Sequence, residues 1–272
     1  MKRLSIVVPI YNSEKYIDAF LENVLKQIDI EEDEIILVDD GSSDNSNKIC
    51  KDYQNRYNNI KFYSISNSGP SKARNIGIQE AEGKHLFFLD IDDSIEDDYI
   101  EQLLKYIQNY DLAVCGYNLI KVDKKESVKV NMQTQIINKD NIMNLLQNDM
   151  MLNTLWNKVY RLDIIKKNMI KFDEKEFRGE DLLFNLDYIA NIKNDIYITD
   201  SILYNYFMKS TGLNLGYRES ITTKFRRTNK TYKKMIKISN RYKNKILCMT
   251  IKSYIHHIIF LAKSIIKDII SK

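Results

Sequence analysis

The feature that most constrains the fold is an alternation of short apolar runs with helical patterns in the first part of the chain, up to Tyr117. The runs are rich in β-branched or aromatic residues and end in polar turns, which is typical of buried strands. They are Leu4–Ile10, Glu34–Asp39, Ile60–Ile65, His85–Asp90 and Asp111–Tyr117. Apolar residues at three- and four-residue spacing predict helices over Glu14–Gln27, Asp44–Tyr57, Ser71–Glu82 and Asp97–Gln108. This order predicts an α/β fold with a mostly parallel central sheet and helices on both faces.

Beyond Tyr117 the pattern is weaker. We expect a hairpin within Val122–Ile137, helices over Asn138–Gln147 and Gly179–Ala190, and strands near Ile196–Thr199 and Leu203–Phe207. From Arg218 the pattern is helical to the end. Because no Pro- or Gly-rich linker precedes this part, we expect residues 211–272 to form a helical C-terminal extension packed on a body of residues 1–210.

The net charge of +4 is distributed unevenly. Residues 201–272 hold 16 Lys and Arg against 2 Asp and Glu, which leaves 25 basic and 35 acidic residues in 1–200 and net charges of +14 and −10. Such a basic tail is expected to meet a phospholipid surface, a polyphosphate or a nucleic acid.

No run approaches the roughly 18 apolar residues of a membrane-spanning helix, and no signal peptide is expected. Three dispersed cysteines exclude a disulfide framework and fit a reducing compartment.

Polar clusters follow three of the expected strands, at Pro9–Asn12, Val38–Asp44 and Leu89–Asp93. Since the loops after parallel strands converge on one rim of a sheet, these clusters should be read together as a ligand site. In the third cluster, Asp90 and Asp92 are two residues apart and can point to the same side of an extended chain. Paired carboxylates of this kind suit Mg²⁺ or Mn²⁺.

Several classes of protein lack support in the sequence. There is no dinucleotide-binding G-x-G-x-x-G and no P-loop. His85 is the only histidine before His256, so a Ser-His-Asp or Cys-His apparatus is not expected. Two alternatives stay open: a Mg²⁺-dependent phosphate-handling domain of the receiver or phosphatase kind, and a nucleic-acid binder that uses the basic tail. The first would place an acidic pair after the first strand, where this chain has Pro-Ile-Tyr-Asn.

Five segments in order carry a family resemblance: IVVPIYN, LVDDGSSD, SNSGPSKARNIGI, FLDIDD and RGEDLLFN. Together they resemble the family 2 glycosyltransferases of the bacterial polysaccharide-assembly type, over about Leu4 to Tyr206. The resemblance implies a GT-A (nucleotide-diphospho-sugar transferase) fold, with a catalytic domain over residues 1–210 and the basic helical extension over 211–272.

The resemblance also implies roles for individual residues. Those implied for the nucleotide-sugar donor are Pro9, Tyr11 and Asn12 around the base, Asp39 and Asp40 at the base or ribose, and Lys72 and Arg74 near the diphosphate. Asp92 is the implied metal ligand, with Asp90 at the ribose or metal and Asp93 as a substitute. Asp181 is the implied general base, with Glu180 beside it. Trp156 in WNKVYR is implied near the acceptor, and Lys209 could close over the diphosphate.

The implied function is an inverting, metal-dependent transfer of a hexosyl or N-acetylhexosaminyl group. The donor would be a UDP-sugar, the cofactor Mn²⁺ or Mg²⁺, and the acceptor a hydroxyl of a glycan or lipid-linked sugar in cell-surface polysaccharide synthesis. We expect a cytoplasmic protein held peripherally on the inner face of the cell membrane, where the C-terminal helices meet an anionic membrane surface. No nucleic-acid partner is expected, and a homo-oligomer is left open.

Overall fold

The computed structural model describes residues 2–131, 133–138, 153–176 and 178–209, together with 226–227, 229–231 and 233–235 of the C-terminal extension. The helix expected over Asn138–Gln147, apart from its first residue, lies outside the described residues. So do most of the helices expected after Arg218. The boundary between 210 and 211 stays a prediction.

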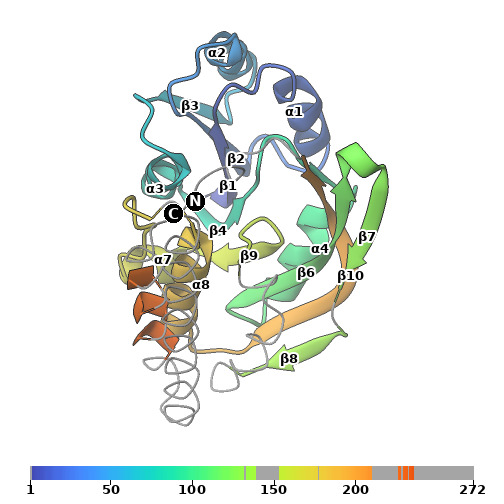
Figure 1. The fold of residues 1–272 in the computed structure, drawn as a ribbon, viewed down its shortest axis with the longest axis vertical. Coiled ribbons are helices and arrows are strands. Elements are labelled where there is room, and N and C mark those ends of the chain that lie inside the picture. The colour runs from blue at the N-terminus through green and yellow to red at the C-terminus, as the bar shows by residue number, and fades with distance from the viewer. Residues whose placement is uncertain are drawn as a thin grey trace, which may run out of the picture.

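One sheet forms the centre of the described structure (Figure 1). Its strands are β1 (Lys2–Ile10), β2 (Asp33–Asp39), β3 (Ile60–Ser64), β4 (Gly83–Phe88), β5 (Ser94–Ile95), β6 (Leu112–Lys121), β7 (Glu126–Val130), β8 (Gln135–Ile137), β9 (Lys158–Arg161) and β10 (Ile196–Met208). The strand order is β3-β2-β1-β4-β9-β6-β10-β5, with β7 on β6 and β8 on β10. The pairs among β3, β2, β1 and β4 are parallel, as is β6 with β10, whereas β9 runs antiparallel between β4 and β6.

Helices cover both faces of the sheet because strand side chains alternate between two cores. The helices are α1 (Ile17–Leu25), α2 (Ser46–Arg56), α3 (Pro70–Glu80), α4 (Tyr99–Ile107), α7 (Leu162–Lys167) and α8 (Glu180–Asn191), with a short 3₁₀ turn at Val122–Lys124. On β1, Ile6 and Val8 face a core shared with α1, α2 and α4. Val7, between them, faces the core of α3, α7 and α8. The α/β fold with a mostly parallel sheet is confirmed.

The structure differs from the expected elements in several places, and helix α7 and the short strand β5 are among those not predicted. Strand β9 was not predicted, because its four residues follow Trp156 without a turn signal and are ordered by antiparallel pairing with β4 and β6. The hairpin expected within Val122–Ile137 is wrong: β7 folds back on β6, and β8 pairs with β10. The two strands expected near the end of the body form one strand, β10, with irregular register between Ile198 and Tyr204.

Gly69 and Pro70 set the start of α3, and Gly77 allows the helix to pack closely on the sheet. Gly69 has φ of +92°, which a side-chain-bearing residue rarely adopts, and Pro70 follows at the first helical position. One face of α3 packs so closely on β1 that a Cβ on Gly77 would lie 2.2 Å from a methyl carbon of Val7. This close packing fixes the side chain of Arg74, one turn into α3, above the carboxyl ends of the strands.

The described pieces of the C-terminal extension lie beside α8 and α7 (Figure 1). Lys230 pairs with Asp173 at 2.7 Å and with Glu176 at 2.5 Å. Lys234 pairs with Asp187 of α8, and Met235 is buried in the α8 core. Part of the basic charge of the tail is therefore bound to the acidic body. Within the described ranges no helix is long and apolar enough to cross a membrane.

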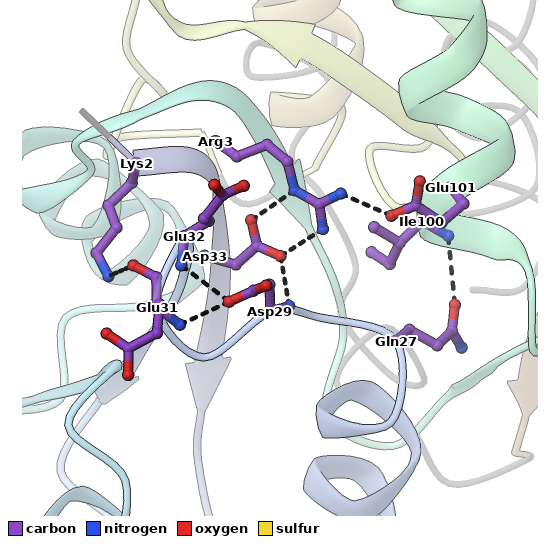
Figure 2. A network of polar contacts seen from close by, with 9 residues as sticks. All are labelled: Lys2, Arg3, Gln27, Asp29, Glu31, Glu32, Asp33, Ile100 and Glu101. Carbon is purple, nitrogen blue, oxygen red and sulfur yellow. Dashed lines mark hydrogen bonds and ion pairs between the residues drawn. The ribbon is translucent and has the colours of Figure 1, made fainter.

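A polar network ties the amino ends of the strands together, at the opposite end of the sheet from the loops after β1 and β2 (Figure 2). Arg3 of β1 donates hydrogen bonds to both carboxylate oxygens of Asp33 and to Glu101 of α4. The backbone N–H of Asp29 donates to the Asp33 carboxylate, and the Asp29 carboxylate accepts from the backbone N–H groups of Glu31 and Glu32. Because the hydrogen-bond donors and acceptors of this network are paired with one another, we interpret this end of the sheet as structural.

Candidate active site

The loops after β1 and β2 are bonded to each other at the carboxyl rim of the sheet. Asn12, with φ of +46°, accepts hydrogen bonds through its side-chain oxygen from the backbone N–H and hydroxyl of Ser43. Its own N–H donates to the Ser42 hydroxyl. Pro9 lies within β1, and Tyr11, next to Asn12, is 43% exposed. The rim therefore presents an aromatic ring to solvent on a loop that two serines hold in place.

Asp39 and Asp40 are buried, and both position this rim. Asp39 accepts hydrogen bonds from the Ser42 N–H at 3.2 Å and from Ser64 and Asn47 at 3.3 Å. The two oxygens of Asp40 accept from the backbone N–H groups of Ser68 and Gly69, at 2.7 and 2.8 Å. The Asp40 contacts fix the loop that starts α3, and the nucleoside role of both carboxylates stays a prediction.

Arg74 joins two carboxylates that are far apart in the sequence. Its Nη2 lies 3.1 Å from Oδ1 of Asp90, and its Nη1 lies 3.5 Å from Oδ1 of Asp181. The guanidinium lies over the ring of Phe172 at 5.6 Å, and no described residue accepts a hydrogen bond from its buried Nε. Lys72, two residues earlier, is 43% exposed and 3.6 Å from Glu174. The structure thus brings the expected Arg74, Asp90 and Asp181 together and leaves Lys72 at the outer edge.

Asp181 lies in the first turn of α8, after Gly179, whose φ is +71°. Burial raises the pKa of Asp181 to about 7; Arg74 and Lys158 act to lower it, and the charges of Glu180 and Asp90 act to raise it. A carboxylate with a pKa near neutrality can hold or release a proton at working pH, which is the property of a general base.

The three carboxylates after β4 have different environments. Asp93 is buried and accepts hydrogen bonds from the Tyr204 hydroxyl at 2.9 Å and from the Phe207 N–H at 2.9 Å, so it fastens this loop to β10. Asp92 is 42% exposed, and its Oδ2 lies 2.8 Å from Nζ of Lys209. Lys209 also lies 4.1 Å above the ring of Tyr16. Asp90 and Asp92 are therefore the carboxylates that a ligand can reach.

These two carboxylates fit a hard divalent cation. Asp90 binds Arg74 and Asp92 binds Lys209 through one oxygen each, which leaves the second oxygen of each for another ligand. No group of three or more metal-ligating side chains gathers in the part of the chain that the structure describes. Two carboxylates with phosphate oxygens and water are a usual set for Mg²⁺. The site therefore suits a metal ion that binds together with a diphosphate.

Sequence reasoning did not single out one buried charged residue near the candidate base. Lys158, inside the segment WNKVYR, is buried and acts electrostatically on Asp181, and no charge pattern marks it in the sequence. Trp156 of the same segment is 6% exposed and stacks on Tyr204 at 4.3 Å, which makes it part of the core. The contact of Trp156 with the aromatic residues of β10 could have been predicted only if β9, which begins two residues after Trp156, had been recognised in the sequence.

Comparison with solved structures places this arrangement in a known fold. The chain superposes on *Staphylococcus aureus* TarS 1–349 in complex with UDP-GlcNAc with a TM-score of 0.76 and 25% identity, over 92% of this chain and 71% of that one. The UDP complex of the same protein gives a TM-score of 0.74 at 26% identity, with 92% and 70% covered. The α/β body with its carboxylate-lined rim therefore has the GT-A fold.

The family follows from the sequence comparison. The model of glycosyl transferase family 2 matches residues 5–169, so the chain belongs to this family. Poly(ribitol-phosphate) beta-N-acetylglucosaminyltransferase TarS of *Staphylococcus aureus* is 31% identical over 216 residues, 78% of this chain and 36% of that protein. Cholesterol galactosyltransferase of *Borreliella burgdorferi* is 29% identical over 218 residues, 75% of this chain and 60% of that protein. The chain spans less than two thirds of the length of such relatives.

Proposed function

We propose that the protein transfers a sugar from a UDP-sugar to a hydroxyl of a glycan or lipid-linked acceptor, with inversion at the anomeric carbon. One observation carries this proposal: Arg74 holds Asp90, on the metal side of the rim, and Asp181, the candidate base, in a single cluster. Family membership favours this function over a receiver-like or phosphatase domain and over a nucleic-acid binder. The UDP-GlcNAc complex of the similar TarS structure supports UDP as the nucleotide.

The donor would lie along the rim. The exposed ring of Tyr11 offers a flat face for the base, between Pro9 and Asn12. Asp39 and Asp40 set the shape of the adjoining loops, and a carboxylate oxygen of Asp39 would accept from a uracil N–H or a ribose hydroxyl.

The diphosphate would meet positive charge at the start of α3 and around the two carboxylates. In the first turn of α3, Pro70 has no N–H and the N–H groups of Lys72 and Ala73 donate to the Gly69 carbonyl, so the side chain of Lys72, which extends into solvent, supplies the positive charge there. Asp92 and Asp90 would hold Mn²⁺ or Mg²⁺. When bound there, the metal would neutralise the charge that develops on the leaving diphosphate. Lys209, already 2.8 Å from Asp92, supplies a further cation at the same place.

Asp181 would accept the proton of the acceptor hydroxyl. One base on the acceptor side with direct displacement of the diphosphate inverts the anomeric centre. Retention through a covalent intermediate would need a carboxylate placed as nucleophile. Arg74 orients the Asp181 carboxylate and keeps part of it ionised, since a guanidinium favours the charged form.

The location of the reaction is part of the same proposal. We expect a peripheral protein of the inner membrane face, acting in cell-surface polysaccharide synthesis. Lys230 and Lys234 are bound to the acidic body, so any cations that contact anionic lipid would be other ones in residues 211–272. Sedimentation with anionic liposomes, before and after truncation at Gly216, tests this part. Equal recovery of both proteins in the pellet would contradict it.

Calorimetry with UDP tests the donor and the metal together. We expect UDP to bind more tightly with Mn²⁺ or Mg²⁺ than with EDTA, and more tightly than GDP. Equal affinity with and without EDTA would remove the metal from the mechanism, and tighter GDP binding would remove the uridine assignment. Release of UDP from UDP-GlcNAc, UDP-glucose and UDP-galactose, with water as acceptor, then identifies the sugar without knowledge of the natural acceptor.

A further inference from the structure

Lys158 is a buried cation that lacks a bonded carboxylate. Its side chain, on β9, is 1% exposed. The ammonium donates hydrogen bonds to the Thr154 carbonyl oxygen at 2.6 Å, the Thr154 hydroxyl at 3.1 Å and Oδ1 of Asn157 at 2.6 Å. Three acceptors satisfy its three protons, and none of them is charged. Among the described residues, no carboxylate forms an ion pair with it.

The acceptors around Lys158 do not depend on it. The Thr154 carbonyl also accepts from the side-chain amide of Asn185 at 2.9 Å, and Oδ1 of Asn157 also accepts from the Thr154 hydroxyl at 2.8 Å. With an apolar side chain of similar length, the Thr154 carbonyl and Asn157 Oδ1 would each keep a donor, and the Thr154 hydroxyl would still donate to Asn157. Burying a charge is costly unless a partner compensates it. The local hydrogen bonds thus give no structural reason for a charge at this position.

The charge faces the candidate base. Lys158 and Tyr160 lie on the same side of β9, since they are two residues apart. Both are tied to Asn185 of α8: the Tyr160 hydroxyl donates to Asn185 at 2.7 Å, and Lys158 shares the Thr154 carbonyl with it. Asp181 lies one turn before Asn185 and therefore on the same face of α8. Burial lowers the pKa of Lys158 to about 7, and the charge of Asp181 acts against this shift. Lys158 in turn acts to lower the pKa of Asp181, so each favours the charged form of the other.

We propose that Lys158 is a positioning residue for the base: its buried ammonium stabilises the negative charge of Asp181 from beneath, while Arg74 does so from the rim. This inference rests on the proposed function, because it assumes that Asp181 acts as a base. Lys158 forms no hydrogen bond with Asp181, so it occupies none of the lone pairs of that carboxylate.

Charged groups on the neighbouring elements also act on the pKa of Asp181, and Lys158 is one contribution among them. Arg74 of α3 favours the carboxylate, whereas Glu180 of α8 and Asp90 after β4 oppose it; Tyr160 of β9 is neutral. A cation in contact with a carboxylate shifts its pKa by about one to three units. Because Lys158 acts without contact, we expect its removal to raise the pKa of Asp181 by about half a unit to one unit.

The test is a carboxyl titration of Lys158→Met in the full chain. Protein labelled with ¹³C at the aspartate side-chain carboxyls is titrated by NMR, and the Asp181 resonance is the one that Asp181→Asn removes. We expect it to titrate at higher pH in Lys158→Met than in the wild type. The acidic limb of UDP-GlcNAc hydrolysis should move by the same amount, while UDP affinity stays unchanged. The thermal midpoint should be equal to or higher than that of the wild type.

Tyr160→Phe is the matched control, because it removes a buried hydrogen bond to Asn185 without changing charge. It should lower the thermal midpoint and leave the Asp181 titration in place. An unmoved Asp181 resonance in Lys158→Met would overturn the proposal. If that variant does not fold, Lys158→Gln, which keeps a donor for Thr154, is titrated instead and judged by the same criterion. Absence of hydrolysis in the wild type with every UDP-sugar tested would count against the proposed function, whereas the NMR titration would still decide the role of Lys158.

Discussion

Arg74 lies 3.5 Å from Asp181, a residue 107 positions later in the chain, while its other terminal nitrogen binds Asp90. The guanidinium is almost fully buried, so both contacts are weakly screened by solvent. One side chain therefore balances the charge of the metal-side carboxylate and that of the candidate base. When a ligand changes the charge at Asp90, the environment of Asp181 changes as well.

Replacing Arg74 tests this balance. In Arg74→Met, Asp90 still repels the charge of Asp181 and the compensating cation is gone, so the pKa of Asp181 should rise above 7. Sugar transfer at pH 7 should fall by about 10-fold or more, and UDP binding should weaken. Arg56→Met, at the carboxyl end of α2 and away from the rim, serves as control and should retain both properties. Unchanged transfer by Arg74→Met at pH 7 would contradict the balance.

Asp181→Asn separates catalysis from binding. The substitution keeps the shape of the side chain and removes the basic oxygen, so transfer should fall roughly 100-fold or more. UDP affinity, measured by calorimetry, should stay nearly constant. Asp187→Asn, on the same helix and paired with Lys234 of the tail, is the matched control and should retain transfer. If Asp181→Asn transfers sugar normally and only unfolds at lower temperature, its role is to cap α8, and Glu180 becomes the first candidate base.

The raised pKa of Asp181 also makes stability depend on pH. In the unfolded chain an aspartate has a pKa of about 4, whereas burial raises that of Asp181 to about 7 in the fold. Between these values the folded state binds the extra proton, so Asp181 makes the free energy of unfolding decrease as pH rises from about 4 to about 7. Urea denaturation should show Asp181→Asn gaining stability over the wild type at pH 8 but not at pH 4. An equal difference at both pH values would show that the carboxyl titrates normally.

Lys230 should anchor the C-terminal extension to the body. Its ammonium lies 2.5 Å from Glu176, which is buried, and 2.7 Å from Asp173. Because Lys230 is about one-third exposed, we expect Lys230→Gln to cost about 1 kcal/mol in the free energy of unfolding, less in 1 M NaCl. A double-mutant cycle with Glu176→Gln measures the coupling, and Lys129→Gln, at an exposed position of β7, is the control. Zero coupling would show that the pair of Lys230 with Glu176 does not hold the tail on the body.

Local patterns predicted the parts of the fold that local sequence determines. The strands before the rim, the Gly69–Pro70 start of α3 and the alternate placement of Asp90 and Asp92 all depend on neighbours along the chain. Strand β9 could not be found in this way, since its order comes from pairing with β4 and β6.

The same limit applies to charges. The surplus of basic residues in the tail was visible in the sequence, but its contact with Asp173 and Glu176 is tertiary. The two cations that act on Asp181 come from segments 107 and 23 residues away, Arg74 and Lys158. A carboxylate motif therefore indicated the candidate base, and only the fold supplied the groups that set its pKa.

Asp92 should behave differently from Asp181 when its charge is removed. Its reachable carboxylate binds Lys209 through Oδ2 at 2.8 Å and is placed to bind a divalent cation through the other oxygen. Asp92→Asn should therefore lose both sugar transfer and the part of UDP affinity that EDTA abolishes in the wild type. Calorimetry with UDP in Mn²⁺ and in EDTA measures this, and Asp97→Asn, an exposed carboxylate of the same loop region, is the control. If Asp92→Asn keeps an EDTA-sensitive affinity equal to that of the wild type, the metal is held elsewhere, with Asp90 the next residue to replace.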